Sequence, residues 1–172
     1  MKQSVFEDNN KDADVLREQL KKDKTFLLNV MSSPGSGKTS TLLALAKAFE
    51  GKIKWAVMEA DIDSTVDAET MKNAGVDSIQ LHTGAVKNMT ILSVPEGHDK
   101  PLKYPLMYET CDLLVVNKVD VMEYFDFDPE KVVEYAKMRN PNIDVIFISA
   151  TKGKGVGTLA EWILEKTREW NE

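Results

Sequence analysis

The feature that most constrains the fold is a glycine-rich segment between an apolar run over 26–31 and a helix-like run over 40–49. The segment reads Ser32-Ser33-Pro34-Gly35-Ser36-Gly37-Lys38-Thr39. In a strand–loop–helix context such a loop binds phosphate, because its backbone N–H groups surround the anion at the positive end of a helix. The usual pattern has glycine where Ser32 stands, but Pro34 and Gly35 still supply the tight turn. A Gly/Ser linker is disfavoured by the flanking strand and helix.

The loop provides a candidate phosphate and magnesium site. Lys38 is expected to reach the β- and γ-phosphates, and the Thr39 hydroxyl is expected to bind Mg²⁺. The candidate nucleotide ligands in this region are Pro34, Gly35, Ser36, Gly37, Lys38, Thr39 and Ser40.

A second motif indicates which base is bound. The continuous apolar run 112–116, typical of a buried parallel strand, leads into Asn117-Lys118-Val119-Asp120. This is the N-K-x-D pattern of GTPases, in which one carboxylate accepts from both N1–H and the exocyclic amine of guanine. Adenine lacks that donor pair, so a buried Asp120 would reject it.

A third segment agrees with the guanine prediction. The run 143–148 reads as a strand and ends in Ser149-Ala150, which resembles the last GTPase signature. Backbone N–H groups at that signature contact the guanine carbonyl. We therefore expect Asn117, Lys118, Asp120, Ser149 and Ala150 to form the base site, and GTP to be preferred over ATP.

Composition and element order predict one soluble α/β domain. The chain has 172 residues, a net charge of −6, a single cysteine and no run of 18 apolar residues. These values argue against nucleic acid or a membrane as partner and favour a reducing cytoplasm. Strands are expected near 78–82 and 89–94, a helix is expected from after Ser64-Thr65 to about Asn73, and Asp128-Pro129-Glu130 is a good helix start. Strands thus alternate with helices, which predicts a P-loop NTPase with a mostly parallel sheet flanked by helices. Residues 1–24 are expected to form an N-terminal helical extension, and 25–172 the GTPase domain.

Asp61 is the carboxylate with the strongest functional interpretation. It follows an apolar run over 54–60, at a strand end that faces the nucleotide in this class of sheet. There it could hold Mg²⁺ or orient the attacking water. The alternative is an exposed loop acid, one of three aspartates in a polar turn.

Four segments together resemble the HypB family, the nickel-inserting GTPases of [NiFe]-hydrogenase maturation. They are 29–39, Glu59-Ala60-Asp61-Ile62-Asp63, His82-Thr83-Gly84 and Ser93-Val94-Pro95-Glu96-Gly97-His98-Asp99-Lys100-Pro101-Leu102-Lys103-Tyr104-Pro105. The resemblance implies a slow GTPase of the dimerising SIMIBI class of P-loop proteins. It implies that Lys38 and Asp61 are catalytic, that Thr39 and Asp61 bind Mg²⁺, and that a nickel-metallochaperone accessory protein and a hydrogenase large-subunit precursor are partners.

The chain departs from the HypB pattern after Ala85. In that family the Thr-Gly pair is followed by a Cys-His metal motif, a further strand and a second metal-binding cysteine. Here Gly84-Ala85 passes directly to Val86, so several tens of residues are absent from the sequence. Either the protein carries this segment and the present sequence lacks it, or the segment is deleted and hydrolysis is in doubt.

The remaining residues predict no nickel or zinc site. Cys111, His82 and His98 are the soft or imidazole candidates besides methionine, and their spacing matches no metal-site pattern. Cys111 is expected in the core and His98 on the surface. Nickel or zinc would therefore bind through the absent segment.

Three functions remain open. The first is a GTP-hydrolysing nickel metallochaperone for hydrogenase or for another nickel enzyme such as urease. The second is a GTP-binding regulatory module without significant hydrolysis, and the third is a small-molecule kinase, against which Asn117 to Asp120 argue.

Overall fold

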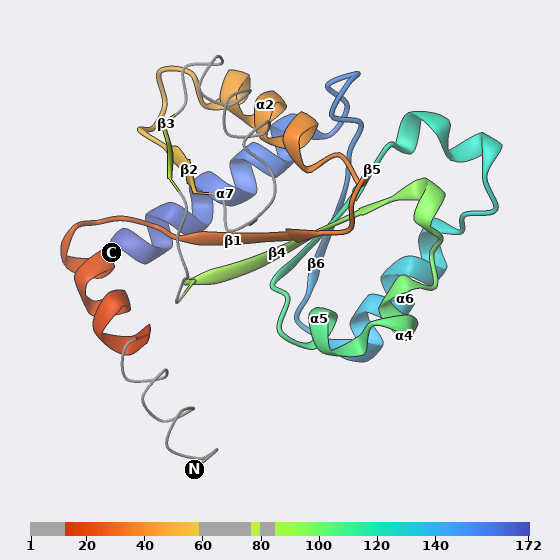
Figure 1. The fold of residues 1–172 in the computed structure, drawn as a ribbon, viewed down its shortest axis with the longest axis horizontal. Helices are drawn as coiled ribbons and strands as arrows, with labels where there is room; N and C mark the ends of the chain where they lie inside the picture. The colour runs from red at the N-terminus through yellow and green to blue at the C-terminus, as the bar shows by residue number, and fades with distance from the viewer. Residues whose placement is uncertain (1–12, 59–76, 80–84) are drawn as a thin grey trace, which may run out of the picture.

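A four-stranded parallel sheet forms the centre of the molecule (Figure 1). The computed structural model describes residues 13–58, 77–79 and 85–172. The strand order is β1-β4-β5-β6. The strands are β1 (Leu28–Ser32), β4 (Lys87–Ser93), β5 (Leu113–Asn117) and β6 (Asp144–Phe147). Two shorter strands, β2 (Ala56–Met58) and β3 (Asp77–Ile79), pair in parallel as a separate sheet.

Helices cover both faces of the sheet (Figure 1). On one face lie α2 (Lys38–Phe49) and α7 (Val156–Asn171). On the other lie α4 (Lys100–Lys103), α5 (Pro105–Glu109) and α6 (Pro129–Arg139). Two 3₁₀ helices, η1 (Val94–Glu96) and η2 (Val119–Tyr124), follow β4 and β5. This arrangement confirms the predicted α/β fold with a parallel sheet flanked by helices.

The alternation of side chains along β5 divides the core into two clusters. Leu113 and Val115 pack with the buried residues of α2 and α7, whereas Leu114 and Val116 pack with those of α5 and α6. Successive side chains of a strand point to opposite faces, and both faces are covered here. This is why the strand is apolar at four consecutive positions, Leu113 to Val116, rather than at every second one, and why all five of its residues are buried.

Strand β4 ends one residue earlier than its apolar run. The sequence predicts a strand through Val94, but the backbone turns after Ser93. The Glu96 carboxylate accepts hydrogen bonds from the Ser93 backbone N–H at 2.7 Å and from the Ser93 hydroxyl at 2.8 Å. This capping box starts η1 and stops the strand.

Other expected elements are met in part. Helix α6 begins after Asp128, whose carboxylate accepts from the backbone N–H groups of Glu130 and Lys131, as its cap pattern predicts. Residues 13–22 are helical. The helix predicted to follow Ser64-Thr65 and to end near Asn73 lies outside the described residues, as does most of the strand expected over 78–82.

The N-terminal helix is fastened to the end of α7. The Trp170 indole N–H donates to the Thr25 carbonyl at 3.0 Å. Lys21 donates to the Trp170 carbonyl and lies over the same indole ring, 5.2 Å from its centroid.

Among the helices of residues 13–58, 77–79 and 85–172, none combines the length and the hydropathy that a membrane span requires.

Candidate nucleotide-binding site

Three loops meet at the carboxyl edge of the sheet. Strand β1 leads into the glycine-rich loop, β5 into Asn117 and Lys118, and β6 into Ile148 and Ser149. In a parallel sheet these strand ends lie side by side, so segments far apart in the sequence form one surface. The structure therefore brings together the phosphate loop and both predicted base-binding segments.

The phosphate loop has the backbone shape that its glycines allow. Gly35 and Gly37 have φ values of +78° and +94°, a region that residues with a side chain rarely adopt. Gly37 is the N-cap of α2, and its carbonyl accepts from both the backbone N–H and the hydroxyl of Thr41, each at 2.9 Å. The loop thus ends on the first turn of a helix, where backbone N–H groups favour an anion.

Side chains of the loop divide into buried and accessible groups. Ser36 is fully buried, Pro34, Gly35 and Ser40 are exposed, and the two predicted phosphate and magnesium ligands, Lys38 and Thr39, are half-buried. The backbone of these two residues belongs to the first turn of α2.

Asn117 connects the base-binding segments to the phosphate loop. Its Nδ2 donates to the Ser36 carbonyl at 3.0 Å. Its Oδ1 accepts from the backbone N–H of Lys118 at 2.8 Å and from that of Ala150 at 3.1 Å. The side chain is almost fully buried, so these bonds are shielded from water. One amide therefore holds three loops in register.

Lys118 makes a second connection to the same loop. Its Nζ donates to the Gly35 carbonyl at 2.7 Å. The Lys118 backbone has a φ of +64°, which is uncommon for any residue other than glycine. This strained conformation is maintained by the tertiary contacts around Lys118.

Asp120 lies beside Ser149, as a base-binding carboxylate would. The side-chain hydrogen bond from Ser149 lowers the pKa of Asp120 below its ordinary value, and the positive charges of Lys152 and Lys118 act in the same direction. The sequence predicts that the Asp120 carboxylate is buried, but Asp120 is exposed. It belongs to η2, the 3₁₀ helix that follows β5, in which no residue is buried. The carboxylate is therefore ionised and open to a ligand.

The loop that carries Ser149 is closed on itself. The Ser149 hydroxyl accepts from the Lys152 backbone N–H at 3.3 Å, and the Ser149 backbone N–H donates to the Lys154 carbonyl at 2.9 Å. Gly155 allows the turn back into α7, because a Cβ there would lie 2.2 Å from the Phe147 carbonyl oxygen. Sequence reasoning did not identify Lys152 as a neighbour of Asp120.

The remaining candidate residues are placed as follows. Asp61 and His82 lie outside the described residues. Cys111 is fully buried in the core, as predicted. His98 was expected on the surface, but it is half-buried, and its Nδ1 accepts from the Asp128 backbone N–H at 3.2 Å. Within the residues that the structure describes, no three His, Cys, Asp or Glu side chains are grouped as a metal site.

The fold and the joined loops define a P-loop nucleotide-binding protein. The family model for the nucleotide-binding domain of CobW, HypB and UreG matches residues 26–88. The solved structure described as HypB from Helicobacter pylori in complex with nickel superposes with a TM-score of 0.87 at 29% identity, covering 94% of this chain and 96% of that one. A HypB structure from Archaeoglobus fulgidus, 24% identical, shares the fold with a TM-score of 0.83, covering 93% of this chain and 98% of that one.

Sequence relatives identify the family. The hydrogenase maturation factor HypB of Azotobacter vinelandii is 32% identical over 205 residues, which covers 95% of this chain and 68% of the relative. HypB of Escherichia coli K12 is also 32% identical, with 92% of this chain and 69% of the relative covered. The chain belongs to the HypB family of hydrogenase maturation factors. The first alignment, at 205 residues, is longer than the whole chain of 172, so that relative contains residues with no counterpart here.

Proposed function

We propose that this protein binds GTP, hydrolyses it slowly, and assists nickel insertion into a [NiFe]-hydrogenase. One observation carries the guanine part of the proposal. Asn117 and Lys118 both donate to carbonyls of the phosphate loop, while Asp120 beside them is exposed and held ionised. A nucleotide with its phosphates on the loop would then reach that carboxylate with its base.

The base preference follows from hydrogen-bond chemistry. The ionised Asp120 carboxylate offers two acceptors in one plane, and guanine offers N1–H and an exocyclic amine to match them. The Ala150 backbone N–H, held by the Asn117 Oδ1, lies in the segment expected to contact the guanine carbonyl. Adenine would leave the charged carboxylate without its two donors, which disfavours ATP.

The phosphate end would use Lys38 and Thr39. The Lys38 ammonium would neutralise charge on the β- and γ-phosphates during transfer to water. The Thr39 hydroxyl and the Asp61 carboxylate are hard oxygen ligands of the kind that Mg²⁺ prefers, and they would hold the ion beside the phosphates. Bound Mg²⁺ would supply charge neutralisation on the phosphate oxygens. Asp61 could alternatively orient the attacking water.

Nickel would be the cargo of this protein rather than a resident cofactor. The Helicobacter pylori relative that is 28% identical is named a hydrogenase/urease maturation factor. On that basis we propose that this chain also takes part in the maturation of a nickel enzyme. It would form a nucleotide-dependent homodimer, and its partners would be an accessory nickel chaperone and a hydrogenase large-subunit precursor. Ni²⁺ or Zn²⁺ would bind through the segment that the HypB pattern has and this sequence lacks.

We also propose that residues 1–24 form an extension to a GTPase domain over 25–172. We propose that the protein acts in the cytoplasm.

The base-site proposal is tested by replacing Asp120 with asparagine. The amide presents a donor where the carboxylate presents an acceptor, so it matches xanthine better than guanine. We expect affinity for fluorescent mant-GDP to fall roughly 10- to 100-fold and affinity for the xanthine analogue to rise. Asp126→Asn, a matched change in an exposed carboxylate nearby, should alter neither. An unchanged preference in Asp120→Asn would remove this residue from the base site.

A GTP-binding regulatory module without significant hydrolysis is the second candidate. It is favoured by the direct passage from Ala85 to Val86, where the sequence departs from the HypB pattern. Single-turnover measurement of GTP hydrolysis, with Mg²⁺ and Ni²⁺ present, separates the two. Turnover above the uncatalysed rate that is lost in Lys38→Ala supports the enzyme; tight GTP binding with no turnover supports the module.

A further inference from the structure

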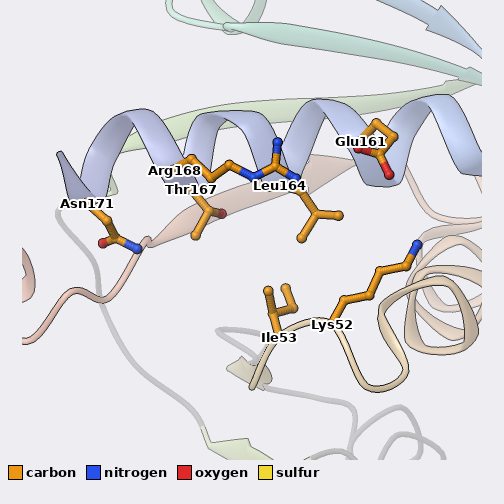
Figure 2. Close-up of a pocket in the computed structure, with 7 residues that line it drawn as sticks. All are labelled: Lys52, Ile53, Glu161, Leu164, Thr167, Arg168 and Asn171. Atoms are coloured by element: carbon orange, nitrogen blue, oxygen red, sulfur yellow. The ribbon is translucent and has the colours of Figure 1, made fainter.

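A pocket of about 570 Å³ lies between the turn that follows α2 and the carboxyl-terminal half of α7 (Figure 2). Its lining residues are Lys52, Ile53, Glu161, Leu164, Thr167, Arg168 and Asn171. Neither the phosphate loop nor the base-binding segments contribute to it. It is therefore separate from the site of the proposed function, and the inference below does not depend on that function.

The pocket has an apolar floor. Figure 2 shows the Ile53 and Leu164 side chains directed toward each other across the pocket. Leu164 is a buried member of the core cluster beneath α7, and Ile53 packs against the same cluster. The floor is thus fixed by the protein core, and an apolar group placed on it would leave water.

Two cationic side chains, Lys52 and Arg168, lie at the rim of the pocket. Lys52 and Arg168 are both exposed. In the described part of the chain, neither side chain forms an ion pair or a hydrogen bond, and the same holds for Glu161, the one carboxylate of the lining. Two cations and one carboxylate among the lining residues give the rim a net positive charge, in a chain whose overall charge is −6. This local reversal of sign favours an anion.

The remaining polar groups fit the same kind of ligand. Figure 2 shows the Asn171 amide nitrogen on the side of the pocket, where it is available as a donor. Asn171 Oδ1 is buried and accepts no hydrogen bond within the described residues. The Thr167 hydroxyl donates to the Ile163 carbonyl at 2.7 Å, so its hydrogen is already used. Of the Asn171 amide, therefore, only the nitrogen suits an anion, because the oxygen is itself an acceptor.

From these observations we propose that the pocket binds a small amphiphilic anion. Its apolar body would lie against Ile53 and Leu164, and its carboxylate or similar acidic group would lie between Lys52 and Arg168. The volume falls within the range of small-molecule sites, about 300–1,000 Å³, which favours a compact ligand over a protein surface. The ligand would contact the far ends of α2 and α7, two helices whose opposite ends begin at the nucleotide site.

The proposal is tested with 8-anilino-1-naphthalenesulfonate, which joins an apolar ring system to a sulfonate. We expect saturable fluorescence enhancement with one site per chain. The double variant Lys52→Glu/Arg168→Glu should weaken binding at least tenfold. A control with the same change of charge, Lys47→Glu/Lys137→Glu, alters exposed residues outside the pocket and should change the dissociation constant less than twofold. Circular dichroism and urea denaturation establish that both variants are folded.

Two further probes separate the parts of the ligand. Uncharged 1-anilinonaphthalene should bind the native protein more weakly than the sulfonate and should not distinguish the two double variants. Decanoate, added to ¹⁵N-labelled protein, should shift the amide signals of Lys52, Ile53 and Arg168. Equal binding of the sulfonate to the native protein and the pocket variant would overturn the proposal, as would decanoate shifts confined to other parts of the chain.

Discussion

At the scale of single residues, the candidate site depends on how closely Asn117 approaches the phosphate loop. A Cβ on Gly37 would lie 2.4 Å from Asn117 Nδ2, far inside van der Waals contact. The neighbouring Gly35 has a similar positive φ but no atom within 4 Å of the corresponding position. Two glycines of one motif therefore serve different purposes. Gly35 permits a turn, and Gly37 permits both a turn and the approach of another strand's side chain.

Replacing Gly37 with alanine should be more damaging than replacing Gly35. Both changes strain the backbone, at a cost of about 1–2 kcal/mol, but only Gly37→Ala displaces the Asn117 amide from the Ser36 carbonyl. We expect the free energy of unfolding to fall by about 1–3 kcal/mol more in Gly37→Ala than in Gly35→Ala. Urea denaturation measures both. Equal losses would mean that the close approach to Asn117 does not matter for stability.

The pH dependence of guanine binding should report the ionisation of Asp120. Its pKa is lowered by the Ser149 hydrogen bond, so the carboxylate remains charged as pH falls and is neutralised only below its ordinary value of 3.8. Affinity for mant-GDP should therefore lose nothing through this group between pH 8 and about 5. Ser149→Ala should move the loss to higher pH. An affinity loss centred above pH 5 in the native protein, with its circular dichroism unchanged, would contradict this assignment.

At the scale of elements, short polar contacts determine where helices and strands begin and end. Ser93 and Glu96 stop β4, and Asp128 starts α6. The backbone N–H of the same Asp128 donates to His98, which lies against the Phe127 ring with centroids 5.9 Å apart. The start of α6 is thus attached to the segment between η1 and α4, which follows β4.

Removal of the Asp128 cap should destabilise α6. In Asp128→Ala the N–H groups of Glu130 and Lys131 lose their acceptor, and we expect the midpoint of thermal unfolding to fall by a few degrees. Asp126→Ala, two residues earlier and exposed, should leave it unchanged. Backbone hydrogen bonds from Lys131 and Glu130 lower the pKa of Asp128, so the contribution is present above the ordinary pKa and is lost as pH falls through the lowered value. A deficit of Asp128→Ala that grew below pH 4 would contradict this account.

At the scale of the whole molecule, stability resides in the two clusters on either side of the sheet. Leu159 of α7 is fully buried against β4 and β5 residues, whereas Leu106 of α5 is 78% exposed. Leu159→Ala should lower the free energy of unfolding by about 2–5 kcal/mol through lost burial and a cavity. Leu106→Ala should change it by less than about 0.5 kcal/mol. Chemical denaturation of both variants checks this, and similar losses would mean that the core is not where the structure places it.

The sequence predicts much of this arrangement because each strand carries its own signal. The continuous apolar run before Asn117 specifies a strand covered on both faces, and Asp128-Pro129-Glu130 specifies a helix start. The sequence also contains the Ser93-x-x-Glu96 spacing of a capping box, which stops β4 at Ser93 although the apolar run predicts a strand through Val94. The half-buried position of His98 and the nearness of Lys152 to Asp120 were not predictable, because both depend on contacts between segments far apart in the chain.

The sequence by itself determined the class of fold, and it predicted the phosphate loop and the candidate base-binding residues, since each is encoded by local patterns of a few residues. Only the tertiary structure decided that Asn117 and Lys118 donate to the phosphate loop, that Asp120 stays exposed beside Ser149, and that Lys52 and Arg168 both line one pocket with Ile53 and Leu164. The physical reason is that hydrogen bonds and charge pairing between distant segments depend on the register of the sheet and the packing of its helices. No local pattern contains that information.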